Sequence, residues 1–177
     1  MSENRFGSED PVYENFMRRQ FEEGIELASA SDLVRLHVPP MSPPHFVAEF
    51  LCNGLVREGD GEIRQANEFH VGIWFPPDYL RRSDSLTFEM LRMFTPNVWH
   101  PNVSRRHPLI CVGRLVAGTP LVDILYQIFE VLTYTKYNTR DALNQDACAW
   151  AREHLAEFPI DRRPLKRRAL SLEVQSL

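Results

Sequence analysis

The chain has few cysteines, and their arrangement excludes several classes of protein. Of its 177 residues only three are cysteine, namely Cys52, Cys111 and Cys148. They are widely spaced and odd in number, with no CxxC pair of the kind that holds zinc and no framework of paired disulfides. We therefore expect free thiols and a reducing, cytoplasmic setting.

Long hydrophobic runs and an excess of basic charge are also missing. The longest apolar stretch, residues 121–132, is interrupted by three polar side chains and is too short to span a bilayer. The first ten residues are polar and acidic, without the apolar core of a signal peptide. With 20 basic and 24 acidic residues the net charge is -4. We therefore expect neither a membrane nor a nucleic acid among the partners.

The length and composition predict one globular domain that spans residues 1–177. Hydrophobic residues make up 44% of the chain and charged residues 25%, which are ordinary values for a folded domain. A chain of this length can bury a single hydrophobic core, and no internal repeat or low-complexity block divides it.

Three amphipathic segments predict helices. Asp10 followed by Pro11 is a helix start, and apolar side chains then recur at helical spacing as far as Ala28. Thr119 followed by Pro120 is a second start, and the helix after it is apolar over so wide an arc that it must be central and buried. A third helix is predicted over residues 144–157. The expected apolar stripe of the first helix consists of Phe16, Met17, Phe21, Ile25 and Ala28.

Four strand-like runs lie between the first two helices, at residues 33–38, 46–56, 68–75 and 86–90. A proline cluster, the turn at residues 58–61 and the Pro76-Pro77 pair separate them. Short strands joined by turns predict an antiparallel meander. The fold class is therefore α+β, with an N-terminal helix, a four-stranded antiparallel meander sheet, a central buried helix and C-terminal helices.

The end of the chain is a basic tail, residues 161–177. Five of its first eight residues are basic: Arg162, Arg163, Lys166, Arg167 and Arg168. Such a run predicts a solvated face or a last short helix, and a docking surface for an acidic partner is the functional alternative.

The stretch from Phe94 to Val112, FTPNVWHPNVSRRHPLICV, contains the candidate chemistry. A tripeptide of His100, Pro101 and Asn102 ends nine residues before Cys111. The proline stiffens the loop, and the Asn102 amide supplies hydrogen-bond donors from a fixed point. One interpretation is a cysteine that handles acyl groups, with Asn102 stabilising negative charge on oxygen. The other is a buried strand with an inert thiol.

A resemblance that extends beyond this loop favours the first interpretation. The landmarks are Phe75-Pro-Pro-Asp-Tyr79, the tripeptide at His100, Ile110-Cys111, and Asp141-Ala-Leu-Asn144 with Ala147. In this order and at this spacing they resemble those of ubiquitin-conjugating (UBC) enzymes. The resemblance covers residues 11–158, which would form a UBC-like core, and implies the fold already predicted.

The resemblance also implies roles for individual residues. Cys111 matches the cysteine that receives a ubiquitin-like modifier from an activating enzyme as a thioester and passes it to a lysine of a protein substrate. Asn102 matches the asparagine that steadies the loop and supports the oxyanion, and His100 and Pro101 shape that loop. Asp141 matches the acidic residue that positions the incoming lysine. No cofactor and no metal is implied.

Partners are implied with less detail. The exposed side of the first helix meets the activating enzyme in the family, which gives Arg18 and Arg19 a second use. The chain departs from the family pattern at two loops, with Leu80 where a proline usually follows Tyr79, and with no tryptophan between Cys111 and Pro120. Ligases engage these loops, so a ligase is an optional partner. Such departures suit a divergent member, for example of a bacterial-type system.

Three alternatives stay open at this point. One is a non-catalytic binding module with the UBC fold, although it has less reason to keep Cys111, Asn102 and Asp141 together. Another is a cysteine hydrolase, which needs a histidine base that no spacing here supplies. The last is a zinc site made of His100, His107 and Cys111, whose spacing is unlike that of known ligand sets.

Overall fold

The computed structural model describes residues 10–39 and 45–167. In chain order the elements are α1 (Pro11–Ser29), β1 (Val34–His37), β2 (His45–Phe50), β3 (Gly54–Arg57), β4 (Ile63–Ala66), β5 (Phe69–Trp74), the 3-10 turn η1 (Tyr79–Arg81), α2 (Thr87–Met90), β6 (Leu91–Met93), α3 (Leu121–Leu132), α4 (Gln145–Glu153) and the 3-10 turn η2 (Leu155–Glu157). The predicted α+β class is confirmed.

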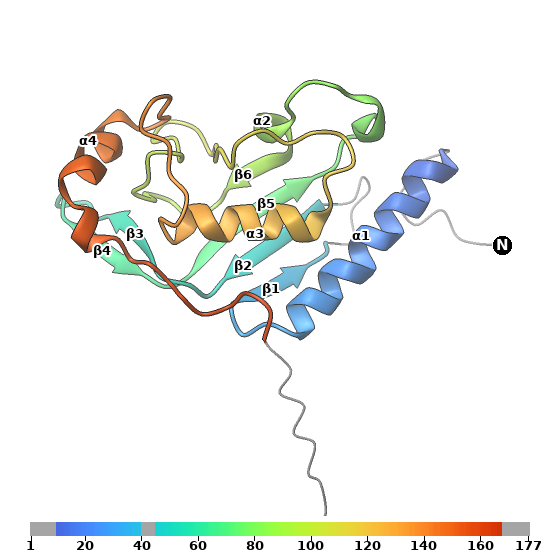
Figure 1. The fold of residues 1–177 in the computed structure, drawn as a ribbon, viewed down its shortest axis with the longest axis horizontal. Coiled ribbons are helices and arrows are strands. Elements are labelled where there is room, and N and C mark those ends of the chain that lie inside the picture. The colour runs from blue at the N-terminus through green and yellow to red at the C-terminus, as the bar shows by residue number, and fades with distance from the viewer. Residues whose placement is uncertain (1–9, 40–44, 168–177) are drawn as a thin grey trace, which may run out of the picture.

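The main sheet has four antiparallel strands in the order β1-β2-β5-β6. The β3-β4 hairpin forms a separate pair, inserted in sequence between β2 and β5. Helix α3 runs across one face of the sheet, α1 lies at the β1 side, and α4 lies at the opposite end of the molecule, beside the β3-β4 hairpin (Figure 1). The predicted meander of four strands is therefore present, with an additional hairpin.

Helix α1 begins as the sequence predicts, because Asp10 accepts a hydrogen bond from the backbone N of Val12 at 2.9 Å and Pro11 occupies the first turn. The stripe that the helix buries differs from the predicted one: it consists of Tyr13, Met17, Gln20, Gly24 and Leu27. Ile25, expected in the stripe, is exposed. A Cβ atom on Gly24 would lie 2.8 Å from side-chain atoms of both Leu36 and Leu121, so glycine permits the close approach of α1 to β1 and α3.

Two of the predicted strands are wrong in extent or type. The expected strand at residues 46–56 is interrupted at residues 51–53, where the backbone N of Asn53 donates to the buried carboxylate of Asp161 instead of continuing the ladder. The expected strand at residues 86–90 is instead the short helix α2, followed by β6. Both buried side chains of α2, Thr87 and Met90, lie three residues apart and so on one helical face. Such a short apolar run does not distinguish strand from helix.

Helix α3 starts at Leu121, one residue later than predicted. Pro120 is the N-cap and offers no side-chain bond, while Thr119 donates back to the carbonyl of Val116. The missing cap comes from another helix: Gln20 on α1, itself buried, accepts from the backbone N of Leu121 at 2.7 Å. Seven residues of α3 are buried, as expected for a central helix: Leu121, Ile124, Leu125, Ile128, Phe129, Val131 and Leu132.

The C-terminal segment contains less helix than predicted. The helix expected over residues 144–157 divides at His154 into α4 and η2. The described part of the basic tail forms no helix but packs against α1, where Arg167 donates to the carbonyl of Ser29 at 2.9 Å and Lys166 pairs with Glu26. The Arg167 bond satisfies a carbonyl at the end of α1. Residues 168–177, including the rest of the predicted basic tail, lie outside the described residues.

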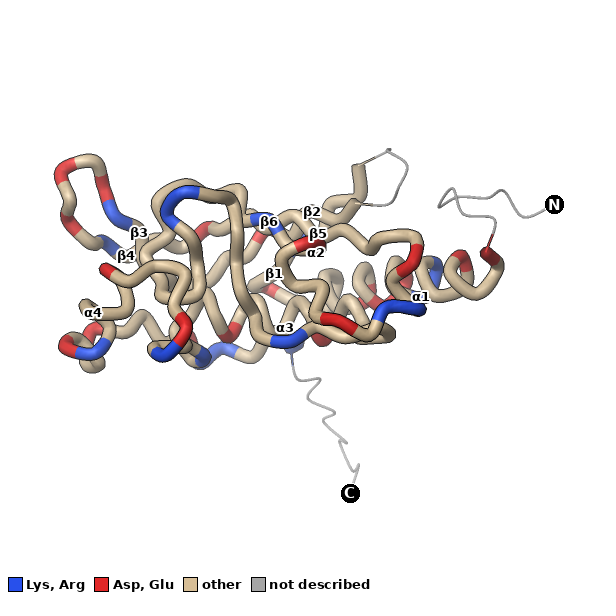
Figure 2. Tube along the Cα trace, turned by 90° about the horizontal axis from the view of Figure 1, so that it is seen from above, with Lys and Arg blue, Asp and Glu red and all other residues tan. Residues whose placement is uncertain are grey.

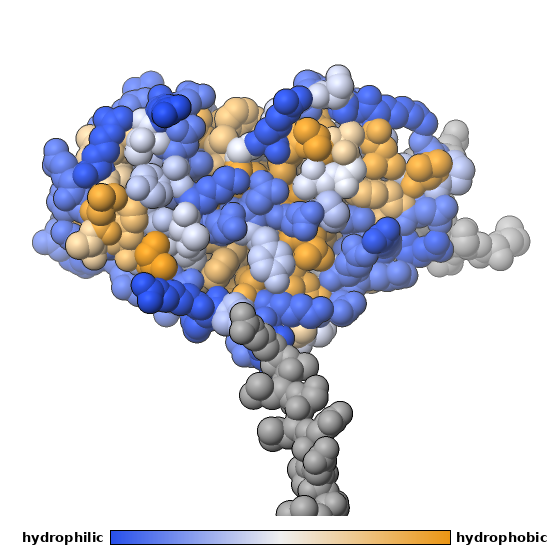
Figure 3. Space-filling view, viewed as in Figure 1, coloured by the Kyte–Doolittle hydropathy of each residue, from blue (hydrophilic) through white to orange (hydrophobic). Residues whose placement is uncertain are grey.

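Acidic and basic residues are interspersed along the chain (Figure 2). On the face shown in Figure 3, hydrophobic residues emerge in separate patches between hydrophilic ones. Within residues 10–39 and 45–167, no helix is long and apolar enough to cross a membrane.

Candidate active site

Asn102 and Cys111 lie side by side at the base of a short hairpin. An isolated bridge joins Val103 to Ile110, and the backbone N of Ser104 donates to the carbonyl of Leu109 at 2.9 Å. Below that bridge the backbone N of Cys111 donates to the carbonyl of Asn102 at 2.8 Å. Residues 104–108, SRRHP, form the tip of the hairpin. The hairpin therefore brings together two predicted site residues that are nine positions apart.

The side chain of Asn102 is buried and bonded at both ends of its amide. Its Nδ2 donates to the carbonyl oxygen of Cys111 at 2.7 Å, and its Oδ1 accepts from the backbone N of Asn138 at 2.8 Å. The side chain is therefore held between the cysteine and the loop that precedes α4. One of its two amide hydrogens is used by the Cys111 carbonyl, which leaves the second for another acceptor.

His100 and Pro101 lie in the interior of the same loop. The His100 ring is buried edge-on against Tyr134, with ring centroids 4.3 Å apart, and burial lowers the pKa of His100 to about 3. Its Nδ1 accepts from the backbone N of Asn102 at 2.9 Å, so the neutral ring carries its proton on Nε2. The carbonyl of Pro101 accepts from the backbone N of Asn144, the N-cap of α4. Both residues thus contact the loop scaffold; their predicted role remains a prediction.

Tyr134 is a part of this scaffold that the sequence analysis missed. It follows α3 in a left-handed backbone conformation, with φ of 59°, and its hydroxyl donates to the carbonyl of Trp99. Burial raises the pKa of Tyr134. The hydroxyl thereby joins the end of α3 to the residue before His100. The sequence offers only a weak signal for this role: a buried tyrosine usually finds a hydrogen-bond partner for its hydroxyl, but the residue type does not say which one.

Of the three thiols, that of Cys111 is the accessible one. Cys111 is partly exposed, whereas Cys52 and Cys148 are buried. Burial, together with the nearby charge of Asp161, raises the pKa of Cys52 to about 12. The Sγ of Cys148 lies 3.4 Å from the carbonyl of Thr139. Since thiolate and access are both needed for reaction, Cys111 is the candidate nucleophile.

Hydrogen bonds from three side chains hold the loop after Cys111. The ammonium of Lys136 donates to the carbonyl of Val112 at 2.6 Å, and the hydroxyl of Thr87 donates to the carbonyl of Gly113, which has a φ of 105°. The hydroxyl of the buried Tyr79 donates to the carbonyl of Thr119 at 2.8 Å. Burial raises the pKa of Tyr79 to about 12. Tyr79, one of the predicted landmarks, therefore anchors this loop.

Asp141 is exposed on the loop before α4 and is connected to Asn102 through Asn138. The Oδ1 of Asn138 accepts from the backbone N of Arg140 at 2.9 Å and from that of Asp141 at 3.3 Å, while its own backbone N donates to Asn102. Asn138 is a further residue that the sequence analysis did not single out. Asparagine side chains commonly accept hydrogen bonds from backbone N–H groups two or three residues later in a turn, and this preference could have pointed to Asn138.

The other candidates do not converge on this site. Arg18 and Arg19 are exposed on α1, where Arg18 donates to Asn15 and Arg19 pairs with Glu23. His100 is buried and His107 is exposed at the hairpin tip, and with Cys111 they form no group of metal-ligand atoms. Within the described ranges, the cluster close enough to share a cation consists of Glu49 on β2, His70 on β5 and Glu68 just before β5. The zinc alternative at Cys111 is therefore not supported.

Solved structures share this architecture. An E2 domain of a Toxoplasma gondii ubiquitin conjugating enzyme matches 80% of this chain and 90% of its own, with a TM-score of 0.55 and 18% sequence identity. S. cerevisiae Ubc12 matches 84% of this chain and 86% of its own, with a TM-score of 0.50 and 17% identity. The chain therefore has the fold of ubiquitin-conjugating enzyme domains. No protein-family model and no curated protein sequence matches it.

Proposed function

We propose that the protein accepts a ubiquitin-like modifier from an activating enzyme as a thioester on Cys111 and transfers it to a lysine amine of a target protein. The observation that carries this proposal is the placement of an accessible Cys111 directly beside a buried, fixed Asn102 in a fold shared with ubiquitin-conjugating enzymes. No cofactor of its own is needed for this chemistry.

The first step is an exchange between thioesters. The Cys111 thiolate attacks the carbonyl carbon of the modifier's activated C-terminus, a new carbon-sulfur bond forms, and the thiolate of the activating enzyme leaves. This step exchanges similar leaving groups and needs mainly an accessible thiolate. The partial exposure of Cys111 supports that role.

The second step makes an amide. The lysine nitrogen attacks the thioester carbon, negative charge builds on the carbonyl oxygen, and the Cys111 thiolate leaves as the nitrogen loses its proton. The second Nδ2 hydrogen of Asn102 is the proposed donor to that oxygen. Asp141 is the proposed group that orients the lysine and takes up its proton transiently, from a loop held through Asn138.

The partners follow from this chemistry. They are the ubiquitin-like modifier, its activating enzyme and protein substrates, with a ligase as an optional addition. Arg18 and Arg19 are the proposed contacts for the activating enzyme, because both guanidinium groups lie on the exposed side of α1. A reducing cytoplasmic setting is proposed as well, since the activity requires Cys111 to stay reduced.

One incubation separates this function from its rivals. The protein is mixed with an activating enzyme, its modifier and ATP, and the products are run on gels with and without reducing agent. An adduct that reducing agent removes supports conjugation, and its absence favours a non-catalytic module. Cleavage of a substrate without activating enzyme would indicate a hydrolase. Against that rival, the neighbouring His100 is buried and its Nδ1 is occupied by the Asn102 backbone.

A further inference from the structure

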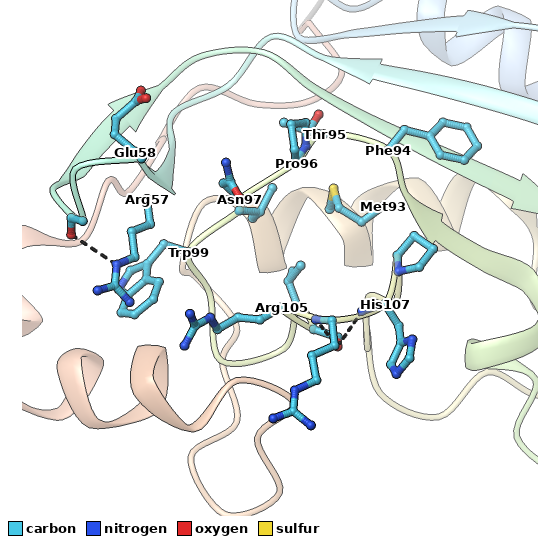
Figure 4. Close-up of a pocket in the computed structure, with 17 residues that line it drawn as sticks. Arg57, Glu58, Met93, Phe94, Thr95, Pro96, Asn97, Trp99, Arg105 and His107 are labelled. Carbon is cyan, nitrogen blue, oxygen red and sulfur yellow. Dashed lines mark hydrogen bonds between the residues drawn. The ribbon is translucent and has the colours of Figure 1, made fainter.

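A basic pocket lies beside the hairpin that ends at Cys111. Three segments line it: residues 57–59 and 61 at the turn between β3 and β4, residues 93–99, and the hairpin tip at residues 103–108 (Figure 4). Its volume is about 640 Å³. None of the roles proposed for Cys111, Asn102 and Asp141 uses this space, and none of these three residues lines it.

The charge of the pocket is opposite to that of the whole chain. Arg57, Arg105 and Arg106 line it, with Glu58 as the acidic side chain among the lining residues. The chain as a whole has a net charge of -4. A local concentration of guanidinium groups in such a background favours an anionic group, because arginine binds oxyanions through paired hydrogen bonds.

Two of the three arginines are held in place by the protein. The guanidinium of Arg57 lies 5.0 Å from the centre of the Trp99 ring and donates from Nε to the carbonyl of Gly61 at 3.2 Å. Arg105 forms an ion pair with Asp146 on α4. Arginines that are already oriented lose less side-chain entropy when a ligand binds.

The side chains of Arg106 and His107 are unpaired within the described part of the chain. The side chain of Arg106, at the hairpin tip, has no hydrogen bond or ion pair with any residue of the described ranges, and the same holds for the ring of His107. An exposed guanidinium without a partner can bind an incoming carboxylate through paired hydrogen bonds.

We propose that this pocket binds an acidic segment, rich in Asp or Glu, of a partner protein. Ligand pockets commonly enclose about 300–1,000 Å³, so this volume suits several residues of peptide rather than one inorganic phosphate. A long nucleic acid would meet the net negative charge of the whole molecule, whereas a short acidic peptide meets only the local field. The proposal concerns binding alone and holds whether or not Cys111 carries a modifier.

The test uses a fluorescein-labelled oligo-glutamate peptide and fluorescence anisotropy at low salt. Arg106→Gln should weaken binding at least about five-fold, because it removes an unpaired cation from the pocket. Arg162→Gln is the matched control: Arg162 is exposed, lies outside the pocket and carries the same charge. Thermal unfolding of both variants should equal that of the parent, since neither side chain makes a polar contact within the described residues.

Several results would overturn the proposal. Equal weakening by Arg106→Gln and Arg162→Gln would show general attraction, and no effect of Arg106→Gln would remove the pocket from the binding site. Binding of a phosphoserine peptide or a single-stranded RNA, but not of oligo-glutamate, would assign the pocket to another ligand. Cys111→Ser should bind the peptide as tightly as the parent, and weaker binding would also count against the proposal. A protein that binds the peptide but accepts no modifier would contradict the proposed function and leave this inference standing.

Discussion

The Nδ2 of Asn102 donates to the carbonyl oxygen of Cys111 at 2.7 Å, while the backbone N of Cys111 donates to the carbonyl of Asn102 at 2.8 Å. The two residues are therefore bonded in both directions. The side chain of Asn102 fixes the position of the Cys111 backbone, and through Asn138 it also holds the loop that carries Asp141. Any change at Asn102 should affect both structure and chemistry.

We predict that Asn102→Ala lowers the free energy of unfolding by about 1–3 kcal/mol, because it leaves the Cys111 carbonyl and the Asn138 N–H without their partners. The variant should still accept modifier on Cys111, yet release it to free lysine at least about ten-fold more slowly, equivalent to 1.4 kcal/mol of barrier. Denaturant unfolding and single-turnover discharge of the purified thioester measure the two effects. Asn67→Ala, at an exposed position between β4 and β5, is the control. Discharge at the parent rate would leave Asn102 as scaffold alone.

Asn138 should act through Asp141. Asn138→Ala removes the Oδ1 that accepts from the backbone N of Asp141, but keeps the backbone N that donates to Asn102. If Asn138 positions the carboxylate, we expect Asn138→Ala and Asp141→Ala each to slow discharge to lysine about ten-fold or more, and the double variant to be no slower than Asp141→Ala. Rates from single-turnover discharge of all four proteins complete the cycle. Independent, additive losses would refute a positioning role for Asn138.

The burial of His100 predicts a specific dependence of stability on pH. The pKa of His100 falls from its ordinary 6.5 to about 3, so the unfolded chain binds a proton that the folded chain does not. Stability from this group is complete above pH 6.5 and declines as the pH falls toward 3, by up to about 1.4 kcal/mol per pH unit. His100→Asn keeps an acceptor for the Asn102 N–H but does not titrate. The stability difference between parent and variant should therefore shift against the parent below pH 6.5; a constant difference would contradict the assignment.

Gln20 should stabilise the start of α3 from α1. Its Oε1 accepts from the backbone N of Leu121, where Pro120 supplies no cap. Gln20→Leu should lower the free energy of unfolding by about 1–2 kcal/mol, the cost of a lost helix cap. The same change at the exposed Gln65 should have little effect. Equal behaviour of the two variants in denaturant unfolding would show that the Gln20 bond contributes nothing.

The sequence predicted those features whose cause is local. Asp10 and Pro11 begin α1 because a cap and a fixed φ act within one turn, and the landmarks from Phe75 to Ala147 predict the fold through their order. Features that depend on distant partners were missed. Gln20 caps a helix 101 positions away, and Asn138 reaches Asn102 across 36. The apolar run at residues 86–90 predicts a strand where helix α2 lies, because four residues are too few to show a helical period.

The central claim is that Cys111, and neither of the other thiols, carries the modifier. With activating enzyme, modifier and ATP, the parent, Cys52→Ser and Cys148→Ser should each form an adduct that reducing agent removes, because those two thiols are buried. Cys111→Ser should form either no adduct or one that resists reducing agent, since an oxyester replaces the thioester. A thiol-labile adduct on Cys111→Ser, formed as fast as on the parent, would contradict the account.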